Sequence, residues 1–591
     1  MGPEKSEKMK CEVVVSLFSD TPVVGCEINP SVRVQTPGTL QPPQHSLIFS
    51  WYREQITCSV HQFELATIQC MPCVSLSIPV KESYHCSTKC FLNTWQRHLA
   101  HHREVAETVN KTKSGVQQAP RKLRSCGSWP EFGRGSLFDG SSTAVEREGK
   151  VWVKVGSSKT YEPSMDDAGF SLRLEFVAVD PMGTQLSPTK IIVTEPVILF
   201  PPQCPRCMIN IRGYQKSWNV NFKVQSLDDI TFTVLSYNIL SDLYASRDMH
   251  GHCPTWALAW EYRRQNLLRE IMEYNADIIC LQEVQSDHFE SFFKPELTKC
   301  GYSVLYKKKT KEVYTANNYI IDGCATFFRC DLFKEIMKYE LEFDKAALSV
   351  VDALEPGLKS QGRIRLLKDN VALVVVLEAL KSGSTYRAIQ SRICVANTHI
   401  HANSNFPDAK LCQVANLVNG LEKIVQSQVP VLICGDLNSV PESDPHRFLV
   451  RGKCPCLQGK KETDPLGIYR LLKLDHKLPL VSAYASFFRS KGVKEHQLRK
   501  MDPKNCEPRF TNFSPGFSGT LDYILYTADT LRVEGLLELL DKETVGVGLP
   551  SPIWSSDHIA LMARFRLKPP SPKKSHPPPL PLNPWVQAAA R

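Results

Sequence analysis

The sequence predicts a layered α/β domain over residues 231–567, preceded by a cysteine-rich region of different character. Short apolar, β-branched runs alternate with amphipathic stretches through this part of the chain, which is typical of strands and helices packed in layers. Several of the apolar runs end directly in a polar cluster. At 591 residues the chain is too long for one hydrophobic core, so we expect several domains.

The beginning of this domain shows the alternation clearly. Residues 232–235 form a short apolar run that we expect to be a strand. Residues 260–274 carry apolar side chains three and four positions apart, which predicts an amphipathic helix. Residues 278–281 are apolar throughout, which indicates a buried strand that ends at Glu283.

Polar clusters follow five of the predicted strands. Strands would deliver them to one edge of a sheet, where carboxylates, amides and imidazoles would meet. That combination is what metal-assisted phosphodiester hydrolysis requires, so the sequence indicates a nuclease. The clusters are Ser236-Tyr237-Asn238, Glu283, Asn397-Thr398-His399, Gly435-Asp436-Leu437-Asn438 and Ser556-Asp557-His558.

Hydrolysis of a phosphodiester needs a cation, a base that aligns water, and donors that hold the transition state. Mg²⁺ prefers a few carboxylate or amide oxygens, and Glu283 with Asn238 suits that role. Asp436 and Asn438 lie two residues apart, so in an extended chain they project to the same side. We expect the carboxylate to orient water and the amide to hold the water or a phosphate oxygen.

The last cluster predicts an imidazole that faces the phosphate. Asp557 could add a metal contact while His558 faces the phosphate. Asp522 could hydrogen-bond that imidazole, which would fix its tautomer and raise its pKa. His399 would be a second donor to the phosphate oxygens.

The motifs SYN, LQEV, NTH, GDLN, LDY and SDH occur in this order within residues 231–567. This ordered set resembles the endonuclease/exonuclease/phosphatase superfamily of DNase I-like folds. Its finer match is to the carbon-catabolite-repressor-four type deadenylases, supported by the string that begins at Trp260 and by the segments 321–328 and 517–523. The resemblance implies a four-layer α/β/β/α sandwich, Mg²⁺ dependence, and 3′-to-5′ removal of mRNA poly(A) with release of AMP.

The resemblance also implies individual roles. Glu283 is the principal metal ligand, and Asn238, Asp436 and Asp557 complete the predicted Mg²⁺ set. Further roles are Asp436 as acid/base residue, Asn438 as holder of phosphate or water, Asp522 with His558 as paired imidazole system, and Asn512 and Phe517 as contacts to the terminal nucleotide.

Two positions depart from the family pattern. The segment 401–407 places no proline where animal relatives stack one on the base, and Asn317 stands where those relatives carry a substrate-contacting Glu. Two alternatives therefore stay open. One is a hydrolase of the same fold that acts on 2′-5′ oligoadenylate or a dinucleotide phosphate. The other is an inert docking scaffold, against which the intact Glu283, Asp436 and His558 argue.

A cysteine/histidine cluster occupies residues 58–102. Pairs of soft ligands at gaps of two and three residues are what tetrahedral Zn²⁺ needs, and eight ligands make about two sites. His101 could replace the last ligand, and the competing interpretation is buried free cysteines with surface histidines. We expect Cys204 and Cys207 to stay unligated. The predicted ligands are Cys58, His61, Cys70, Cys73, Cys86, Cys90, His98 and His102.

The second half of this cluster resembles a MYND zinc finger, as in plant members of the deadenylase family. The resemblance implies that the first and third ligand pairs share one metal and that the second and fourth pairs share the other. Such a finger would dock a partner, which we expect to be a subunit of a Ccr-Not-type complex, the companion Caf-type deadenylase. Leucine-rich repeats, which dock yeast and animal deadenylases, are absent from the sequence.

These patterns predict four parts. Residues 1–200 would form an immunoglobulin-like β region, indicated by Trp51-Tyr52-Arg53 and by 161–174, with the finger inserted at 58–102. Residues 201–230 would be a connector, 231–567 the nuclease domain, and 568–591 a disordered Pro-rich tail.

Composition indicates which class of partner and which cellular compartment to expect. The net charge of +10 is compatible with a polyanion such as RNA. The N-terminus is charged, and no segment approaches the roughly 18 to 20 apolar residues of a membrane helix. The 21 cysteines then favour burial or metal ligation in a reducing compartment. We expect a protein of the cytoplasm and nucleus that contacts no membrane.

Overall fold

The structure is a computed structural model that divides the chain into two compact units, residues 1–200 and 201–591. Asn317 and Cys73, both named above, lie outside the described residues. The residues that the structure describes are 12–35, 44–61, 64–70, 83–112, 144–147, 150–202, 204–211, 230–315, 318–380, 392–426, 429–454, 462–490, 493–568 and 579–585.

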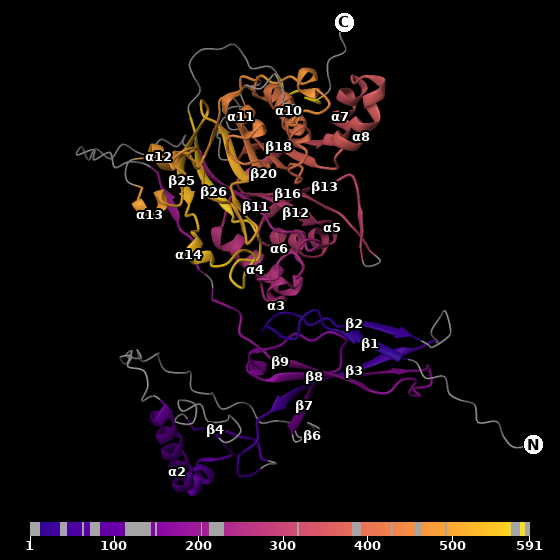
Figure 1. Ribbon diagram of the computed structural model, residues 1–591, viewed down its shortest axis with the longest axis vertical. Helices are drawn as coiled ribbons and strands as arrows, with labels where there is room; N and C mark the ends of the chain where they lie inside the picture. Colours follow the sequence, from indigo (N-terminus) through magenta and orange to yellow (C-terminus); the bar gives the residue numbers. More distant parts are fainter. Residues whose placement is uncertain are drawn as a thin grey trace, which may run out of the picture. The chain divides into compact units, whose positions relative to one another are not determined.

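The C-terminal unit contains a mixed sheet of seven strands (Figure 1). Its central pair, β11 and β12, is parallel, and the neighbours on either side are antiparallel. The strands in spatial order are β10 (Met208–Asn210), β25 (Leu531–Leu537), β26 (Leu561–Leu567), β11 (Thr231–Asn238), β12 (Ile278–Gln285), β16 (Asp322–Arg329) and β13 (Tyr302–Lys308).

A second sheet of six strands has the same central arrangement. Its parallel pair is β19 and β20, and all other neighbours are antiparallel. The strands in spatial order are β17 (Phe333–Glu342), β18 (Val371–Ala379), β19 (Arg392–His399), β20 (Val431–Asp436), β24 (Asp522–Thr527) and β21 (Leu480–Ser482).

The two sheets pack face to face and helices cover their outer faces. Ile278 of one sheet and Leu432 of the other belong to the same buried cluster between the sheets. Ile279, the next residue along β12, points the opposite way and packs with Leu267 of α4. Because both faces of these strands are buried, they are apolar throughout, as the sequence pattern indicates.

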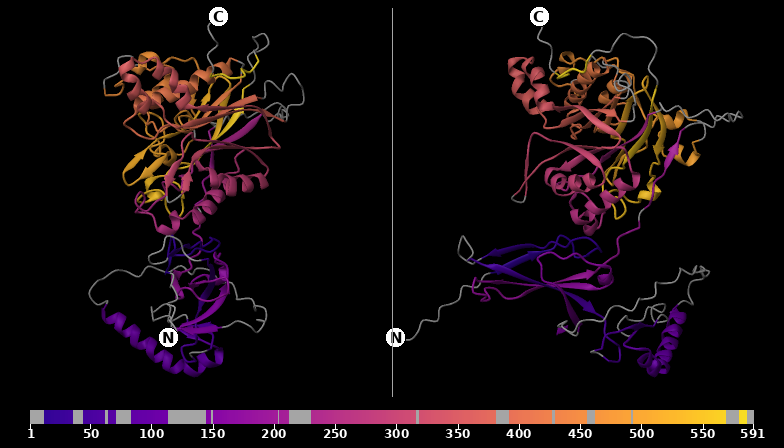
Figure 2. Two further views of the ribbon diagram at one scale, coloured as in Figure 1. Left: turned by 90° about the vertical axis from the view of Figure 1, so that its right-hand side faces the viewer. Right: turned by 180° about the vertical axis from the view of Figure 1, so that it is seen from behind.

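The helices that cover the sheets fall into two groups, visible as coral-to-orange and as magenta ribbons in both views of Figure 2. The six-stranded sheet is covered by α7 (Phe343–Asp352), α8 (Lys359–Leu366), α10 (Pro407–Val425) and α11 (Asp444–Arg451). The seven-stranded sheet is covered by α4 (Trp260–Tyr274) and α6 (Lys294–Lys299). The predicted four-layer α/β/β/α sandwich is therefore confirmed.

The N-terminal unit is rich in strands. Trp51 lies at the centre of its core, fully buried, stacked on Tyr161 and donating its indole N–H to the carbonyl of Ser158 at 3.1 Å. A two-stranded sheet, β1 (Glu12–Ser16) with β2 (Ser31–Gln35), packs on this core. The larger sheet has the order β6 (Ala144–Arg147), β7 (Lys150–Gly156), β3 (Ser46–Gln55), β8 (Ser171–Val179) and β9 (Lys190–Pro196).

The cysteine/histidine cluster lies between two strands that are adjacent in this sheet. β3 pairs directly with β7, yet the chain between β3 and β6 contains all eight predicted zinc ligands. The short strands β4 (Ile68–Gln69) and β5 (Tyr84–His85) and the helix α2 (Thr88–Thr112) belong to this interval. α2 has polar residues along its length, and among the described residues none of the helices is both long and apolar enough to cross a membrane.

The prediction that residues 568–591 form a disordered tail is wrong for part of this segment. Residues 579–585 pack against the C-terminal unit, where Leu580 and Trp585 contact its outer core. Trp585 donates its indole N–H to the carbonyl of Asn416 at 2.9 Å, and the hydroxyl of Tyr339 donates to Pro581 at 2.7 Å. The prediction rested on the high proline content of the whole segment. The contact depends instead on one large aromatic side chain, which composition does not single out.

Gly420 on α10 makes room for this indole. A Cβ atom at position 420 would lie 2.1 Å from the ring of Trp585, so the side chain fits only because the helix carries no side chain there. The tail therefore docks at one specific site on α10.

Loss of this contact should destabilise the C-terminal unit. We expect Trp585→Ala to lower the free energy of unfolding by about 2 kcal/mol, because a half-buried aromatic side chain leaves the core surface. Leu582→Ala is the matched control, because Leu582 is 89% exposed. Urea denaturation of the full chain measures both variants, and equal midpoints for Trp585→Ala and wild type would contradict the docking.

Candidate active site

The strand pairing brings the polar clusters to one edge of the sandwich. In the seven-stranded sheet β11 ends in Asn238, and its parallel partner β12 carries Glu283 two residues before its end. In the six-stranded sheet His399 is directly opposite Asp436, which in turn is opposite Asp522 at the start of β24. The segment before β26 that contains His558 reaches the same edge, because β26 runs antiparallel to β11.

Gly435 allows the close approach of β19 and β20. Its φ is +146°, and a Cβ there would lie 1.9 Å from the carbonyl oxygen of Thr398. Only glycine has the space and the backbone freedom for this contact. The Gly-Asp order therefore holds Asp436 beside His399.

Glu283 lies in a β-bulge. The pairing of β12 with β16 shifts between Leu281 and Val284, and Glu283 adopts a φ of +58°, which is uncommon for a residue with a side chain. Its Oε1 accepts from Asn238 Nδ2 at 3.0 Å and its Oε2 accepts from the backbone N–H of Ser241 at 2.9 Å. The bulge thus turns the carboxylate out of the strand pattern and into the site.

Asn238 connects two carboxylates through its amide nitrogen. Besides Glu283, its Nδ2 donates to Asp436 Oδ2 at 3.1 Å, while its Oδ1 accepts from the backbone N–H of Leu240 at 3.0 Å. Asn238 thereby positions Glu283 and Asp436. Its Oδ1 accepts one hydrogen bond and keeps a second lone pair, so its role as a metal ligand stays a prediction.

His399 and Asn438 form a contact beside these carboxylates. The two side-chain nitrogens, His399 Nε2 and Asn438 Nδ2, are 3.0 Å apart, and the amide is the donor because an amide NH₂ cannot accept. Burial, with a contribution from Lys309, lowers the pKa of His399 to about 3, so the imidazole is neutral. In this arrangement Nε2 accepts from the amide, and the role of His399 as a donor to the phosphate stays a prediction.

Asp436 is fully enclosed by polar partners. Its Oδ1 accepts from the backbone N–H of Asn438 at 2.8 Å. Burial and the nearby Asp522 carboxylate raise the pKa of Asp436 to about 7, although His558 opposes that rise. A carboxylate with a pKa in this range exchanges protons readily at neutral pH, as a general base must.

His558 is held by Asp522. The Nδ1 atom of the imidazole lies 2.7 Å from Asp522 Oδ2, and Nε2 lies 3.7 Å from Asp436 Oδ2 and 3.9 Å from Asp557 Oδ2. Burial works against the imidazolium, but the charges of Asp522, Asp557 and Asp436 raise the pKa of His558 well above its usual value. His558 is therefore a cation at neutral pH.

The carboxylate oxygens at this edge fit a hard divalent cation. Oxygens of Asp436 and Asp522 lie within 4.8 Å of each other. The buried oxygens Asp522 Oδ1 and Asp557 Oδ1 have no hydrogen-bond partner. Buried carboxylate oxygens without partners are costly unless a cation or proton satisfies them, and a hard ion prefers such oxygens.

A groove of about 540 Å³ opens beside Asn438. Phe517, 40% exposed, presents its ring to this groove, as a base-stacking residue would. Asn512, the other predicted substrate contact, instead donates its amide to Asp557 Oδ2 at 2.9 Å and orients that carboxylate. The lining residues are Ala402, Ser404, Pro407, Lys410, Asn438, Ser439, Val440, Ser443, Asp444, Pro445, Thr463, Phe517 and Leu521.

Sequence reasoning did not identify two of the residues that line the groove. Pro407 begins α10 and lines the same groove as Phe517, although the linear spacing from His399 suggested that no proline would do so. Lys410, one turn further along α10, donates from Nζ to the carbonyls of Asn438 at 2.6 Å and Ala402 at 3.2 Å. Their positions depend on how the loop after His399 folds back, which spacing alone does not reveal.

Arg263 is a third residue that sequence reasoning missed. Its guanidinium is fully buried and donates to the carbonyls of Ser555 at 3.0 Å, Ile239 at 2.7 Å and Leu240. It thereby joins the turn after β11 to the loop that leads to His558. One side chain on α4 thus fixes two loops of the site.

Replacing Arg263 should cost more stability than replacing any surface arginine. We expect Arg263→Met to lower the free energy of unfolding by about 3 to 5 kcal/mol, because three buried carbonyls lose their donor. Arg499→Met is the control, because Arg499 is exposed and its ion pair with Glu495 should contribute less than about 1 kcal/mol. Thermal or urea unfolding compares the variants, and equal losses would contradict the role of Arg263.

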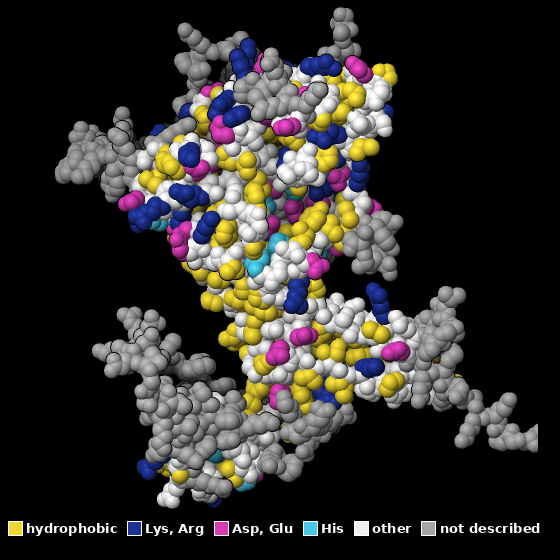
Figure 3. Space-filling model, in the orientation of Figure 1, with side chains coloured by type: hydrophobic (Ala, Val, Ile, Leu, Met, Phe, Trp, Pro, Cys, Tyr) yellow, Lys and Arg dark blue, Asp and Glu magenta, His cyan; other side chains and the backbone are white. Residues whose placement is uncertain are grey.

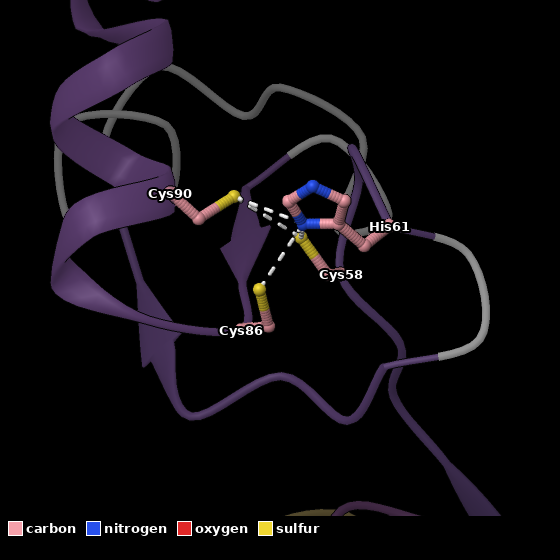
Figure 4. A group of neighbouring side chains, drawn as sticks. All are labelled: Cys58, His61, Cys86 and Cys90. Atoms are coloured by element: carbon pink, nitrogen blue, oxygen red, sulfur yellow. Dashed lines mark hydrogen bonds between the residues drawn. The ribbon is translucent and has the colours of Figure 1, made fainter.

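The N-terminal unit holds a separate group of metal-type ligands (Figure 4). Cys58, His61, Cys86 and Cys90 point toward one another, from two separate parts of the chain. The Sγ atoms of Cys58 and Cys90 are 3.5 Å apart, and His61 Nδ1 lies 3.2 Å from Cys86 Sγ and 3.5 Å from Cys90 Sγ. The first and third predicted ligand pairs therefore lie together.

A second group lies further along the same segment. Ligand atoms of Cys70, His98 and His102 are within 4.8 Å of one another, and Cys70 Sγ is 3.7 Å from His102 Nε2. The remaining predicted ligand, Cys73, lies outside the described residues. Soft sulfur and imidazole donors at these spacings suit Zn²⁺ rather than a hard ion.

The C-terminal unit is similar to a known family and to solved structures. The model of the Endonuclease/Exonuclease/phosphatase family matches residues 217–558. The crystal structure of ANGEL2, a 2′,3′-cyclic phosphatase in complex with adenosine-2′,3′-vanadate, is similar with a TM-score of 0.45 and 28% identity. It covers 62% of this chain and 99% of that chain.

Curated relatives extend the similarity to both units. Carbon catabolite repressor protein 4 homolog 1 of Arabidopsis thaliana is 48% identical over 597 residues, covering 94% of this chain and 98% of the relative. The CCR4-Not complex 3′-5′-exoribonuclease subunit Ccr4 of Saccharomyces cerevisiae is 35% identical over 358 residues, covering 57% of this chain and 38% of that protein. The chain therefore belongs to the endonuclease/exonuclease/phosphatase family, and within that family it groups with the carbon catabolite repressor protein 4 homologues.

Proposed function

We propose that this chain is a Mg²⁺-dependent 3′-to-5′ exoribonuclease that shortens mRNA poly(A) tails and releases AMP. The observation that carries the proposal is the convergence of Glu283, Asp436 and the His558–Asp522 pair at one sheet edge, beside a groove that exposes Phe517. Relatives named as Ccr4 exoribonuclease subunits support the same reaction.

The metal ion would be held by carboxylate oxygens of Glu283, Asp436 and Asp557. Bound there, Mg²⁺ supplies neutralisation of the phosphate charge and of the leaving oxyanion. Asn238 and Asn512 would keep these carboxylates in position through the amide hydrogen bonds described above. The partnerless oxygens of Asp522 and Asp557 support a cation at this place.

The side chains around the metal would divide the remaining work. The Asp436 carboxylate would take the proton of the attacking water, and Asn438 would hold the water or a phosphate oxygen. The His558 imidazolium would donate to a non-bridging phosphate oxygen, where its charge is most useful in the transition state. Water then replaces the 3′ oxygen of the penultimate nucleotide at phosphorus, which frees AMP.

The groove would select the terminal nucleotide. Phe517 would stack on the adenine, and Pro407 lines the same groove. Stacking a base on an aromatic ring contributes about 1–3 kcal/mol. The hydrolases of 2′-5′ oligoadenylate or dinucleotide phosphates remain the alternative, since they would use the same carboxylates with a different arrangement of the groove.

Cleavage assays test the function directly. With Mg²⁺, 5′-labelled RNA ending in adenosines should give a descending ladder, and a tail of mixed sequence should stall it. Glu283→Gln should abolish the ladder, whereas Glu290→Gln should not, because Glu290 is an exposed residue paired with Lys294. Phe517→Ala should lower kcat/KM for adenosine tails by about 5- to 150-fold.

Three results would contradict the proposal. Equal cutting of every tail sequence would exclude poly(A) selectivity. Preference for a 2′-5′ oligomer would favour the alternative enzyme. No cleavage of any substrate would support the inert scaffold.

We further propose that the N-terminal unit binds about two Zn²⁺ ions and docks a partner. Cys58, His61, Cys86 and Cys90 would hold one ion, and Cys70, Cys73, His98 and His102 the other. The spacing of the described ligand atoms supports this division. The partner would be a subunit of a Ccr4-Not-type complex, in particular the companion Caf-type deadenylase, and the complex would act in the cytoplasm and nucleus. The relatives named as Ccr4-Not subunits support that assembly.

Metal analysis tests the zinc proposal. Gently purified protein should contain about two zinc ions per chain, and Cys90→Ser should reduce this to about one. The double variant Cys204→Ser/Cys207→Ser is the control, because both residues are exposed and belong to neither group. A zinc content that is zero in the wild type, or that is unchanged in Cys90→Ser, would overturn the assignment.

A further inference from the structure

We propose that Lys311, Arg365 and Lys368, together named the basic strip, bind the phosphodiester backbone of RNA upstream of the nucleotide being removed. The inference rests on the proposed function, because the strip is defined relative to a site that cleaves RNA. It concerns the length of RNA that the protein contacts, which the cleavage site alone does not determine.

The strip is built from three short segments, two of which contact the ring of Phe406. Arg365 lies in the last turn of α8, Lys368 lies in the loop before β18, and Lys311 follows β13. The guanidinium carbon of Arg365 lies 4.8 Å and the Lys368 Nζ 4.2 Å from the centre of the Phe406 ring. Lys311 Nζ donates to the carbonyl of Leu367 at 3.3 Å, which places it beside Lys368.

Hydrogen bonds tie the strip to the active-site strand. Asn370, two residues after Lys368, donates to the carbonyl of His399 at 3.1 Å. Gln413 on α10 donates to Asn370 Oδ1 at 3.2 Å and accepts from the backbone N–H of His401 at 3.0 Å. The basic side chains are therefore held at a fixed place next to the end of β19.

The three cations of the strip lie near two carboxylates, those of Asp369 and Asp408. Arg365 pairs with the buried Asp408, but no carboxylate of the described residues lies within ion-pair distance of Lys311 or Lys368. Burial, with the neighbouring charges of Lys311 and Arg365, lowers the pKa of Lys368. Cations that repel one another in this way are stabilised when a phosphate chain lies across them.

The strip and the groove lie on opposite sides of one loop. In the segment 401–407, Ala402, Ser404 and Pro407 line the groove. His401 and Phe406 pack together on the side of the strip, with ring centres 5.5 Å apart. In Figure 3, Lys and Arg side chains are visible in the region of α8, and acidic and histidine side chains come to the surface below them.

This placement gives the RNA a continuous path. A chain with its last base in the groove and its scissile phosphate at Asp436 must leave the site on another side. The strip offers cations on that side, next to the end of β19 where His399 lies. Lysines that contact a backbone recognise its charge and not its bases, so the strip would bind any upstream sequence.

The experiment compares long and short substrates with the double variant Lys311→Ala/Lys368→Ala. Arg365 is left unchanged because of its ion pair with Asp408. For a 20-nucleotide adenosine RNA we expect kcat/KM to fall by about 10-fold in 0.1 M salt, and the dependence of log kcat/KM on log salt to flatten by about 1. For the dinucleotide ApA, whose only phosphodiester is the one that is cleaved, we expect a change of less than about twofold.

The matched control is Lys494→Ala/Lys504→Ala. These exposed lysines flank α13 (Glu495–Leu498), which lies on the other side of the unit from α8 (Figure 1). Both RNA lengths should be cut by this variant as by the wild type. A circular dichroism spectrum shows whether each variant is folded.

Two outcomes would overturn the proposed role of the basic strip in RNA binding. One is an unchanged kcat/KM for the long RNA, and the other is an equal loss on both lengths, which would indicate a structural role. If the wild type cleaves no RNA at all, the proposed function fails instead. The strip is then judged by fluorescence anisotropy with the labelled 20-nucleotide RNA, where equal binding by wild type and double variant would overturn it.

Discussion

Crowding of buried carboxylates at one sheet edge is the constraint on which the rest of the site depends. Glu283, Asp436, Asp522 and Asp557 are brought close together with little access to water, so each negative charge raises the cost of the next. The His558 imidazolium and the amides of Asn238 and Asn512 compensate part of that charge. A divalent cation would offset the negative charge that remains.

The backbone accommodates this crowding at two places. Gly435 permits a contact with Thr398 that any side chain would block, and Glu283 adopts a left-handed conformation within a bulge. Both distortions lie where the paired strands end, and neither occurs in the interior of the sheets, which pack as regular apolar layers. Local strain at a functional site persists only when the surrounding structure over-determines it. Here the two parallel strand pairs and the Arg263 contacts provide that surrounding structure.

Sequence reasoning was most accurate where local pattern determines structure. Apolar runs that end in polar residues locate the strand ends, so the meeting of Glu283, Asp436 and His558 follows from periodicity and pairing rules. It was least accurate where a side chain depends on a distant partner. Arg263 bonds to Ser555 across 292 positions, and the tail contact of Trp585 depends on Gly420. The orientation of the Asn238 amide likewise depends on which neighbour takes its oxygen, which a linear motif does not encode.

The distribution of charge separates two tasks of a nuclease, namely cleavage at the carboxylates and attraction of the RNA chain. A cluster of carboxylates repels phosphates, so without help the catalytic edge would exclude its own substrate. Mg²⁺ held by these carboxylates would offset much of that negative charge and supply a positive contact for the phosphate. Attraction of the rest of the RNA chain must then come from other cations, and Lys311 and Lys368 are such cations, tied to the catalytic strand through Asn370. Because exposed charges are screened within about 10 Å at 0.1 M salt, affinity for long RNA should depend on ionic strength while the chemical step in the buried site should not. The affinity for long RNA and the rate of the chemical step can therefore vary independently in this fold.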